Sequence, residues 1–279
     1  MRCIFATDLH GRRGRFPALF SAARKERPDA VLLGGDLLPG YGEIDRFIDE
    51  EIFAPARLLK EEMERPPELF VIMGNDDRRQ FEGRFIEADR SGIIHYMHMR
   101  KASFKDVDIY GCSFVPPTPF LLKDWERYDV SRHLDVGDSP IEEGIHTTDD
   151  DREALMYETV EGHLKALAGD VDMSRSVLLL HAPPYNTYLD RAALDGMMVD
   201  HAPLDVHVGS FAIRRFIEER QPLMTLHGHI HESASITGRW MEKIGRTVCL
   251  SAAFEGDGLC LVRFDTEDPE GARREVITV

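Results

Sequence analysis

The stretch AVLLGGD, residues 30 to 36, decides the fold class of this chain. Four apolar residues, a run typical of a buried β-strand, lead directly into two glycines and an aspartate. Four other segments show the same pattern, an apolar run that ends in glycine or in a polar residue: CIFATD (3–8), LFVIMGN (69–75), SVLLLHAP (176–183) and LMTLHGH (223–229). We interpret all five segments as buried strands.

Helical patterns separate these strands along the chain. They cover residues 16–27, 44–64, 78–90, 153–169 and 210–220, with a break expected at Pro55. The alternation of strands and helices predicts an α/β sandwich. Further strands, expected at residues 106–112, 247–252 and 258–264, follow without intervening helices and indicate a mixed sheet. Neither a repeat nor a change in composition divides the chain, so we interpret residues 1–279 as a single domain.

Two long segments, residues 113–152 and 184–209, lack sustained periodicity. Long irregular segments in a compact domain are usually functional, so we predict that both shape the substrate site. The acidic run at 149–151 favours the N-terminus of the helix that follows it, through the helix dipole. Asp77 and Gln80 fit a capping box before the helix expected at 78–90.

The composition argues against several classes of protein. The formal net charge of −16 disfavours binding to nucleic-acid polymers or to an anionic membrane surface. The sequence shows neither a signal-peptide pattern nor an apolar run of the roughly 18 residues that a membrane span requires, so we expect a cytoplasmic protein without a membrane partner. The four cysteines show no paired spacing and are interpreted as buried, reduced thiols. Nothing indicates a homo-oligomer, and this question stays open.

Side chains able to bind metal follow each of the five buried runs. They are Asp8, His10, Asp36, Asn75, His181, His229 and His231. Because ligands collect at the carboxyl ends of the strands in open α/β sheets, we expect these seven side chains to converge. Carboxylate, imidazole and amide donors without cysteine suit Mn, Fe, Zn or Ni and argue against a structural zinc site. Seven donors exceed the needs of one ion and fit two divalent ions bridged by a carboxylate, which indicates a dinuclear hydrolase.

Taken in order, the motifs D-x-H (8–10), GD (35–36), GN (74–75), H (181) and GHxH (228–231) resemble the calcineurin-like metallophosphoesterase superfamily. The resemblance implies a four-layer αββα sandwich, in which two mixed β-sheets are flanked by helices. It assigns two ligand sets that share one carboxylate: Asp8, His10, Asp36 and His231 for one metal ion, and Asp36, Asn75, His181 and His229 for the other. The implied reaction is hydrolysis of a phosphate ester by attack of a hydroxide that bridges the two ions.

One position departs from the family pattern. Many members carry histidine after the asparagine of the GN motif, where it is thought to protonate the leaving group, whereas this chain carries Asp76. A carboxylate beside two cations is expected to stay ionised and to be a poor acid. The departure favours a small phosphodiester or an activated ester as the substrate. Asp36, Asn75 and Asp76 are the predicted catalytic residues, and the alternatives are a phosphomonoesterase and a non-catalytic metal-binding interaction module.

Three further residues are weaker candidates for the site. His227 has no place in the family pattern, and we interpret it as support for a metal ligand rather than as a ligand itself. Arg78 follows a ligand motif closely enough to contact a phosphate group. His207 lies in the second long segment, from which it could reach the substrate or replace the missing acid. For Arg78 and His207 the simpler interpretation is a solvated side chain.

Overall fold

The alternation of side chains along the buried strands builds the centre of the molecule. The computed structural model describes residues 1–279. In strand β1 (Arg2–Ala6), Cys3 and Phe5 belong to an apolar cluster between two β-sheets, whereas Ile4 and Ala6 belong to a second cluster between the sheets and the helices. Successive side chains of a strand point to opposite faces, so strands that are buried on both faces give continuous apolar runs in the sequence.

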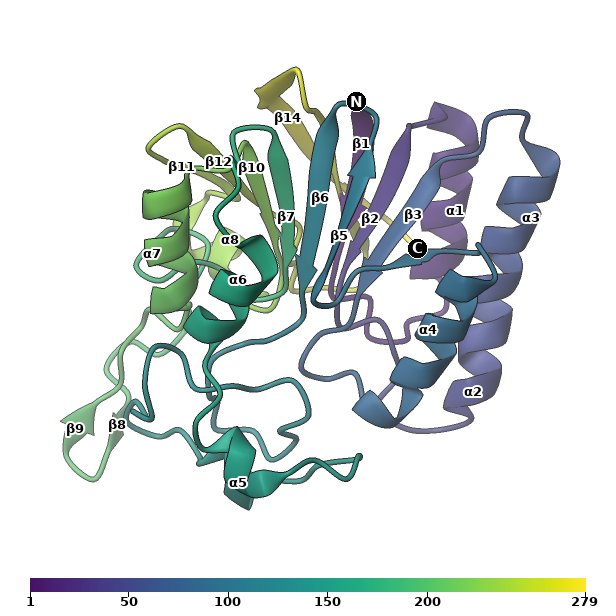
Figure 1. Cartoon of the computed structure of the whole chain (residues 1–279). Helices are drawn as coiled ribbons and strands as arrows, with labels where there is room; N and C mark the ends of the chain where they lie inside the picture. The colour runs from purple at the N-terminus through teal and green to yellow at the C-terminus, as the bar shows by residue number, and fades with distance from the viewer.

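Two six-stranded sheets form the inner layers (Figure 1). The first has the order β14 (Asp268–Ile277), β13 (Leu259–Asp265), β1, β2 (Ala30–Gly34), β3 (Glu68–Ile72) and β4 (His95–Tyr96). The second has the order β11 (Met241–Ile244), β12 (Thr247–Ser251), β10 (Met224–His227), β7 (Ser176–Leu180), β6 (Val107–Cys112) and β5 (Arg100–Phe104). Four strands of each sheet are mutually parallel. In the first sheet β13 and β14 pair antiparallel with their neighbours, and in the second sheet β11 and β5 do so. Both sheets are mixed, as predicted.

Helices cover the outer faces and complete the four-layer sandwich (Figure 1). The first sheet is covered by α1 (Arg15–Glu26), α2 (Ile44–Phe47), α3 (Ala54–Glu62) and α4 (Glu82–Arg90), and the second by α6 (Val160–Ala168) and α7 (Phe211–Arg220). The expected break near Pro55 is a π-helical segment, Ile48–Phe53, which joins α2 to α3. Pro55 itself is the second residue of α3, directly after the π-helical segment, and because proline has no N–H it cannot donate the helical hydrogen bond that another residue would make at this point. A 3₁₀ turn, Arg79–Phe81, precedes α4, and a short helix α8 (Ser233–Thr237) follows β10.

The helix expected at 153–169 is divided in two, and its caps explain the division. Asp151 caps α5 (Arg152–Leu155), and its carboxylate accepts hydrogen bonds from two backbone N–H groups of that helix. Thr159 caps α6, and its hydroxyl accepts from the backbone N–H of Gly162 at 3.0 Å. Each cap starts its own helix, because a capping side chain satisfies N–H groups that lack a partner within the helix.

Three edge strands, β5, β11 and β14, do not stand out in the sequence. Their residues are mostly exposed or partly exposed, as the ten residues of β14 show. Edge strands with charged side chains avoid pairing with other chains, and for the same reason they contain no apolar run. The predicted pattern therefore finds the central strands and misses the edges.

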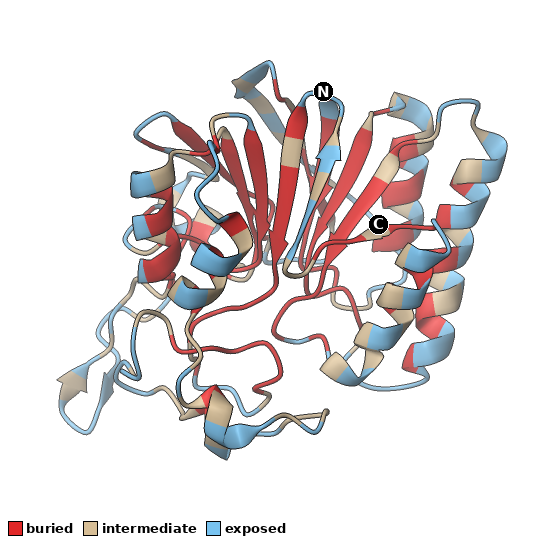
Figure 2. Ribbon diagram, viewed as in Figure 1, coloured by how far each residue is buried: buried red, intermediate tan, exposed pale blue.

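The carboxyl ends of the parallel strands meet along one edge of the molecule, and both predicted irregular segments lie there, at the bottom of Figure 1. Residues 113–152 contain one 3₁₀ turn, Ile141–Glu143, and residues 184–209 contain a small hairpin of β8 (Met198–Val199) and β9 (Ala202–Pro203). Figure 2 shows that parts of these irregular segments are buried. Trp125 is fully buried, so the first segment packs against the sandwich rather than extending into solvent.

Two expectations from the composition can be compared with the structure. All four cysteines are buried and unpaired, as predicted. No helix combines the length and the apolar character that a membrane crossing would need.

Candidate metal centre

The ends of β1 and β2 and the loop after β10 bring together four of the predicted ligands. Asp8, His10, Asp36 and His231 each place a donor atom within 4.8 Å of the others. The Nε2 atoms of His10 and His231 are 3.0 Å apart, and His231 Nε2 lies 3.3 Å from Asp8 Oδ1. His10 Nε2 lies 3.8 Å from Asp36 Oδ2. These are the four residues that the resemblance assigns to one metal ion.

His181, directly after β7, meets Asp36 and Asn75. Its Nε2 lies 3.3 Å from Asp36 Oδ2 and 3.1 Å from Asn75 Oδ1, while its Nδ1 lies 2.7 Å from the carbonyl oxygen of Gly34. The ring centroid of His229 lies 5.3 Å from that of His181. Asp36 Oδ2 is therefore close to imidazoles of both predicted ligand sets, which is the position that a shared carboxylate requires.

Left-handed backbone conformations aim these side chains. Asp8, His10, Asp36 and His229 all have positive φ, between 47° and 72°. Positive φ is uncommon outside glycine, costs roughly 1–3 kcal/mol at each residue and is concentrated at functional sites. Hydrogen bonds hold the turns, because the backbone N–H of Asp8 donates to the carbonyl of Gly35 at 2.9 Å, and the Asp8 carboxylate accepts from the N–H of His229 at 3.1 Å.

Glycine is required at two motif positions by the close approach of other atoms. A Cβ on Gly74 would lie 2.3 Å from Asp36 Oδ1. A Cβ on Gly228 would lie 2.2 Å from Thr7 Oγ1 and 2.7 Å from Asp8 Oδ2. The GN and GH motifs therefore carry glycine because a side chain, in each case including a predicted ligand carboxylate, occupies the space next to the backbone.

The charges of the centre fit divalent metal ions. Asp8 and Asp36 are 1% and 2% exposed, and their carboxylates pair with imidazoles but with no lysine or arginine. Buried charges in proteins are normally paired or coordinate metals. Although burial alone would lower the pKa of His181, the Asp36 carboxylate raises it to about 10, so the site favours a cation on this ring. A divalent ion with carboxylate, amide and imidazole ligands would supply such a cation.

Asp77 has a different role from the predicted helix cap. Its carboxylate is fully buried and accepts hydrogen bonds from the backbone N–H groups of Leu37, Leu38 and Gly74, at 2.7 to 2.9 Å. Helix α4 begins only at Glu82. The capping prediction is wrong, because partners about forty residues earlier in the chain take this carboxylate. Asp77 joins the loop after β2 to the loop after β3, and both loops carry predicted ligands.

Further residues support the centre without any local signal in the sequence. Arg15 is 4% exposed and donates from Nη1 to the backbone carbonyl of Asp8 at 2.6 Å. Trp125 donates from Nε1 to the backbone carbonyl of Asp77 at 2.6 Å. In the sequence, Arg15 lies just before the helix expected at 16–27 and Trp125 lies in an irregular segment, so only contacts between distant parts of the chain reveal these roles.

Asp76 lies at the edge of the centre. Its Oδ2 is 3.5 Å from His10 Nδ1, and its backbone N–H donates to Asp36 Oδ1 at 2.8 Å. Partial burial, and then the negative charge of Asp36, raise the pKa of the Asp76 carboxyl to about 6. The surrounding protein thus disfavours the ionised form of the Asp76 carboxyl. The expectation from the sequence, that Asp76 stays ionised, depends on the positive charge of metal ions beside it.

His227 lies in the core rather than against a ligand ring. It is fully buried in β10, and its two ring nitrogens lie 2.8 Å from the carbonyl oxygen of Ala182 and 2.7 Å from Thr225 Oγ1. Because both nitrogens are engaged in this way, His227 orients no metal-binding imidazole. Its contribution to the centre is limited to holding the backbone residue that follows His181.

The other two weaker candidates also make no hydrogen bond with a predicted ligand. Arg78 is exposed and donates to the backbone carbonyl of Gly40 at 3.0 Å, in the loop after β2. His207 Nδ1 lies 2.8 Å from Asp190 Oδ1, within the segment 184–209. The solvated-charge interpretation therefore fits Arg78, while His207 belongs to a histidine–carboxylate pair of that segment.

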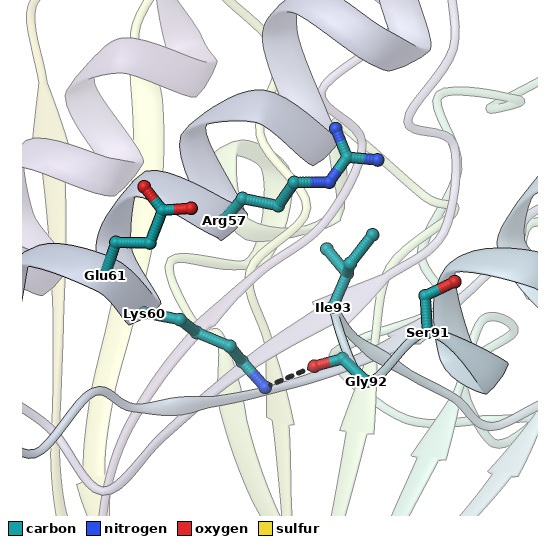
Figure 3. Close-up of a pocket in the computed structure, with 6 residues that line it drawn as sticks. All are labelled: Arg57, Lys60, Glu61, Ser91, Gly92 and Ile93. Atoms are coloured by element: carbon teal, nitrogen blue, oxygen red, sulfur yellow. Dashed lines mark hydrogen bonds between the residues drawn. The ribbon is translucent and has the colours of Figure 1, made fainter.

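A surface cavity of about 390 Å³ lies away from this centre (Figure 3). It is formed by the end of α3 and the turn after α4, and Lys60 Nζ there donates to the carbonyl of Gly92 at 2.8 Å. Lys60 also pairs with Glu68, the first residue of β3, at 3.1 Å. The cavity is therefore near the amino end of β3, opposite to the end that carries Asn75.

The fold and the site together define a class of protein: an αββα sandwich with carboxylate, amide and imidazole side chains gathered at the strand ends, in a set suited to divalent metals. The family model described as calcineurin-like phosphoesterase matches residues 1–233. The chain therefore belongs to the calcineurin-like phosphoesterase family, which confirms the resemblance in the sequence and the expected fold class. The matched region includes all seven predicted ligands.

Individual relatives are more distant. An uncharacterized protein of Methanocaldococcus jannaschii is 41% identical over 76 residues, a match that covers 26% of this chain and 29% of that relative. The chain thus matches less than a third of the relative's length. The crystal structure of TT1561 of Thermus thermophilus has a TM-score of 0.62 at 15% identity, covering 99% of this chain and 98% of that one. A dimetal phosphatase from Danio rerio has a TM-score of 0.54 at 11% identity, covering 100% and 98%. Both structures are similar to this chain in fold.

Proposed function

We propose that this protein is a dinuclear-metal-dependent phosphoesterase that hydrolyses a small phosphodiester. The observation that carries the proposal is the position of Asp36. Its Oδ2 lies 3.3 Å from His181 Nε2 and 3.8 Å from His10 Nε2, while its Oδ1 accepts from the backbone N–H of Asp76. One carboxylate oxygen therefore faces an imidazole of each predicted ligand set. When bound, two divalent ions would supply a deprotonated nucleophile near neutral pH and positive charge for the phosphoryl oxygens.

The chain's own residues would prepare this site. The residues that would hold the two ions are Asp8, His10, Asp36, Asn75, His181, His229 and His231. His181 is the clearest case, because a carbonyl oxygen can only accept and the contact with Gly34 therefore places a hydrogen on Nδ1. Metal-binding histidines commonly use their second nitrogen in this way, which leaves Nε2 of His181 directed at Asp36 and Asn75.

The residues around the ligands support the proposed substrate class. Asp76 stands where a histidine acid is common in the family, and its side chain is 54% exposed at the edge of the centre. Without that histidine, a leaving group that needs little protonation is favoured, as in an activated ester or a small diester. The net charge of −16 opposes long polyanions, and the segments 113–152 and 184–209 lie at the same edge as the centre, where they would limit substrate size.

The test combines metal analysis with a hydrolysis panel. Purified protein is loaded with Mn²⁺, Fe²⁺, Zn²⁺ or Ni²⁺, its metal content is measured, and it is assayed with bis-p-nitrophenyl phosphate and p-nitrophenyl phosphate. We expect metal-dependent hydrolysis with the diester preferred. Asp36→Asn should lose at least a hundredfold in kcat/KM, whereas Asp170→Asn, an exposed aspartate in the turn after α6, should match the wild type. A preference for the monoester would replace the diester proposal with a phosphomonoesterase. Full metal content without hydrolysis under any metal would support the interaction module instead.

A further inference from the structure

A second group of potential metal ligands lies in the segment 113–152 and shares no residue with the candidate metal centre. Asp124, His146 and Asp150 each place a donor atom within 4.8 Å of the others. Asp124 is fully buried, and the side chain of His146 is 1% exposed. Two of the three side chains are therefore enclosed by protein, and the third, Asp150, is 19% exposed, unlike an ordinary cluster of acidic residues on a surface.

His146 has one ring nitrogen engaged and one without a partner. Its Nε2 lies 2.9 Å from the backbone carbonyl oxygen of Ile141, which can only accept, so Nε2 carries a hydrogen. Nδ1 is buried and has no hydrogen-bond partner. In the neutral ring Nδ1 carries a lone pair and acts as an acceptor. The atom that it faces, Asp150 Oδ2 at 3.8 Å, is also an acceptor. Two acceptors that face each other inside a protein are unfavourable unless a cation lies between them.

The carboxylates are held as metal ligands usually are. Asp124 accepts from the backbone N–H of Thr147 at 2.7 Å and from that of Arg79 at 2.8 Å, which fixes its orientation. Asp150 Oδ1 accepts from Arg79 Nη1 at 3.1 Å, while Oδ2, the oxygen near His146, accepts from Thr148 Oγ1 at 2.9 Å. Hydrogen bonds of this kind to metal ligands commonly orient them and raise their affinity. Arg79 supplies one positive charge against two carboxylates, so the group keeps a net negative charge for a further cation.

A protonated His146 is the competing explanation. It would need a hydrogen bond from Nδ1–H to Asp150 Oδ2, and 3.8 Å is too long for one. A metal ion fits the spacing better, because ligand bonds of about 2.0–2.2 Å place the donors of a tetrahedral site roughly 3.3–3.6 Å apart, slightly closer than the 3.8 Å seen between His146 Nδ1 and Asp150 Oδ2. Only small inward movements of the three side chains are then required.

We propose that Asp124, His146 and Asp150 bind one divalent transition-metal ion of the Mn, Fe or Zn type. One imidazole with two carboxylates suits these ions, whereas Mg²⁺ and Ca²⁺ prefer sites made of oxygen donors alone. The ion holds together distant parts of the segment 113–152, and Asp124 in addition accepts the backbone N–H of Arg79 from the turn before α4. The site is a structural one, separate from the phosphoesterase centre, and it does not depend on the function proposed above.

The experiment measures metal per chain. Full-length protein is stripped with a chelator, loaded with Mn²⁺ or Zn²⁺, desalted and analysed by inductively coupled plasma mass spectrometry. We expect His146→Ala to bind one equivalent less than the wild type. The control His133→Ala replaces a histidine of the same segment whose side chain is 77% exposed, and it should bind as much metal as the wild type. The same one-equivalent difference should persist when both proteins also carry Asp36→Asn, which separates this site from the phosphoesterase centre.

A second variant covers the case in which His146→Ala does not fold. Asp150→Asn keeps the size of a side chain that is 19% exposed, and it should also lose one equivalent. Added Zn²⁺ should raise the Tm of the Asp36→Asn protein and raise it less when His146 or Asp150 is also replaced. Folding of each variant is checked by circular dichroism. If a folded variant at either position retains the metal content and the metal-dependent Tm of its parent, the proposal is overturned and the protonated His146 takes its place.

Discussion

Asp77→Asn should destabilise the protein and loosen its metal centre, although the substitution changes neither the size nor the shape of the side chain. The Asp77 carboxylate accepts three backbone N–H groups with both of its oxygens: Oδ1 lies 2.7 Å from Leu38 N and 2.9 Å from Leu37 N, and Oδ2 lies 2.9 Å from Gly74 N. In asparagine one oxygen becomes an NH₂ group, which is a donor. At least one backbone N–H then faces another donor inside the protein.

The expected magnitude follows from these contacts. A buried polar group left without its partner costs about 1–3 kcal/mol, and the substitution creates two, the backbone N–H and the new NH₂. We therefore expect the free energy of unfolding to fall by about 2–6 kcal/mol, since the side chain is fully buried and water cannot replace the lost acceptor. The loops after β2 and β3 carry Asp36 and Asn75, so the variant should also bind metal at least tenfold more weakly.

Urea unfolding measures the first effect and metal titration the second. Trp125 is a convenient reporter, because its Nε1 donates to the carbonyl of Asp77 itself. Asp170→Asn makes the same chemical change at an exposed position and should shift stability by less than about 0.5 kcal/mol. If Asp77→Asn matches this control in both stability and metal affinity, Asp77 does not position the centre.

Two other perturbations test the site and the core. Gly74→Ala should weaken metal binding at least tenfold, because its Cβ would lie 2.3 Å from Asp36 Oδ1. The control Gly83→Ala, inside α4 with open space around it, should instead raise the free energy of unfolding by about 0.5–1 kcal/mol. Equal metal affinity of the two variants in isothermal titrations would contradict the role given to Gly74. Burial holds the pKa of His98 well below 6.5, so the stability it contributes is complete above pH 6.5 and is lost as the pH falls below that value. In urea titrations between pH 7.5 and 5, His98→Asn should therefore lose less stability on acidification than the wild type. His133→Asn, at an exposed position, should lose as much as the wild type. Parallel curves of stability against pH for all three proteins would show that His98 does not cause the loss of stability.

The central strands and the ligand positions were predictable because the information is local. A strand buried on both faces needs a continuous apolar run, and β2 and β7 show one within five residues each. The ligands follow these runs directly, so their order along the chain also gives their place in the fold. The edge strand β14 gives no such signal, because its ten residues are all at least partly exposed.

The residues that support the centre were not predictable, because their partners lie far away in the sequence. Asp77 has the spacing of a helix cap, yet it accepts hydrogen bonds from N–H groups 39 and 40 residues earlier in the chain. His227 is the last residue of β10 and directly precedes a ligand motif, yet both of its ring nitrogens contact core atoms. Spacing along the chain identifies the residues that a motif contains, but it does not show which of them another segment will contact.

The same contacts explain how the centre can hold four residues in left-handed conformations. Each of these turns carries an unfavourable conformational energy, and no regular secondary structure compensates for it. The compensation comes from carboxylates that accept backbone N–H groups of other loops: Asp8 from His229, Asp36 from Asp76, and Asp77 from the turn that follows Asp36. Two of these three carboxylates are themselves predicted ligands, and in Asp36 the hydrogen bond that offsets the strain occupies Oδ1 and leaves Oδ2 facing the imidazoles. The protein thereby arranges the predicted ligands through its own hydrogen bonds, and the proposed metal ions would bind to an arrangement that the chain already maintains.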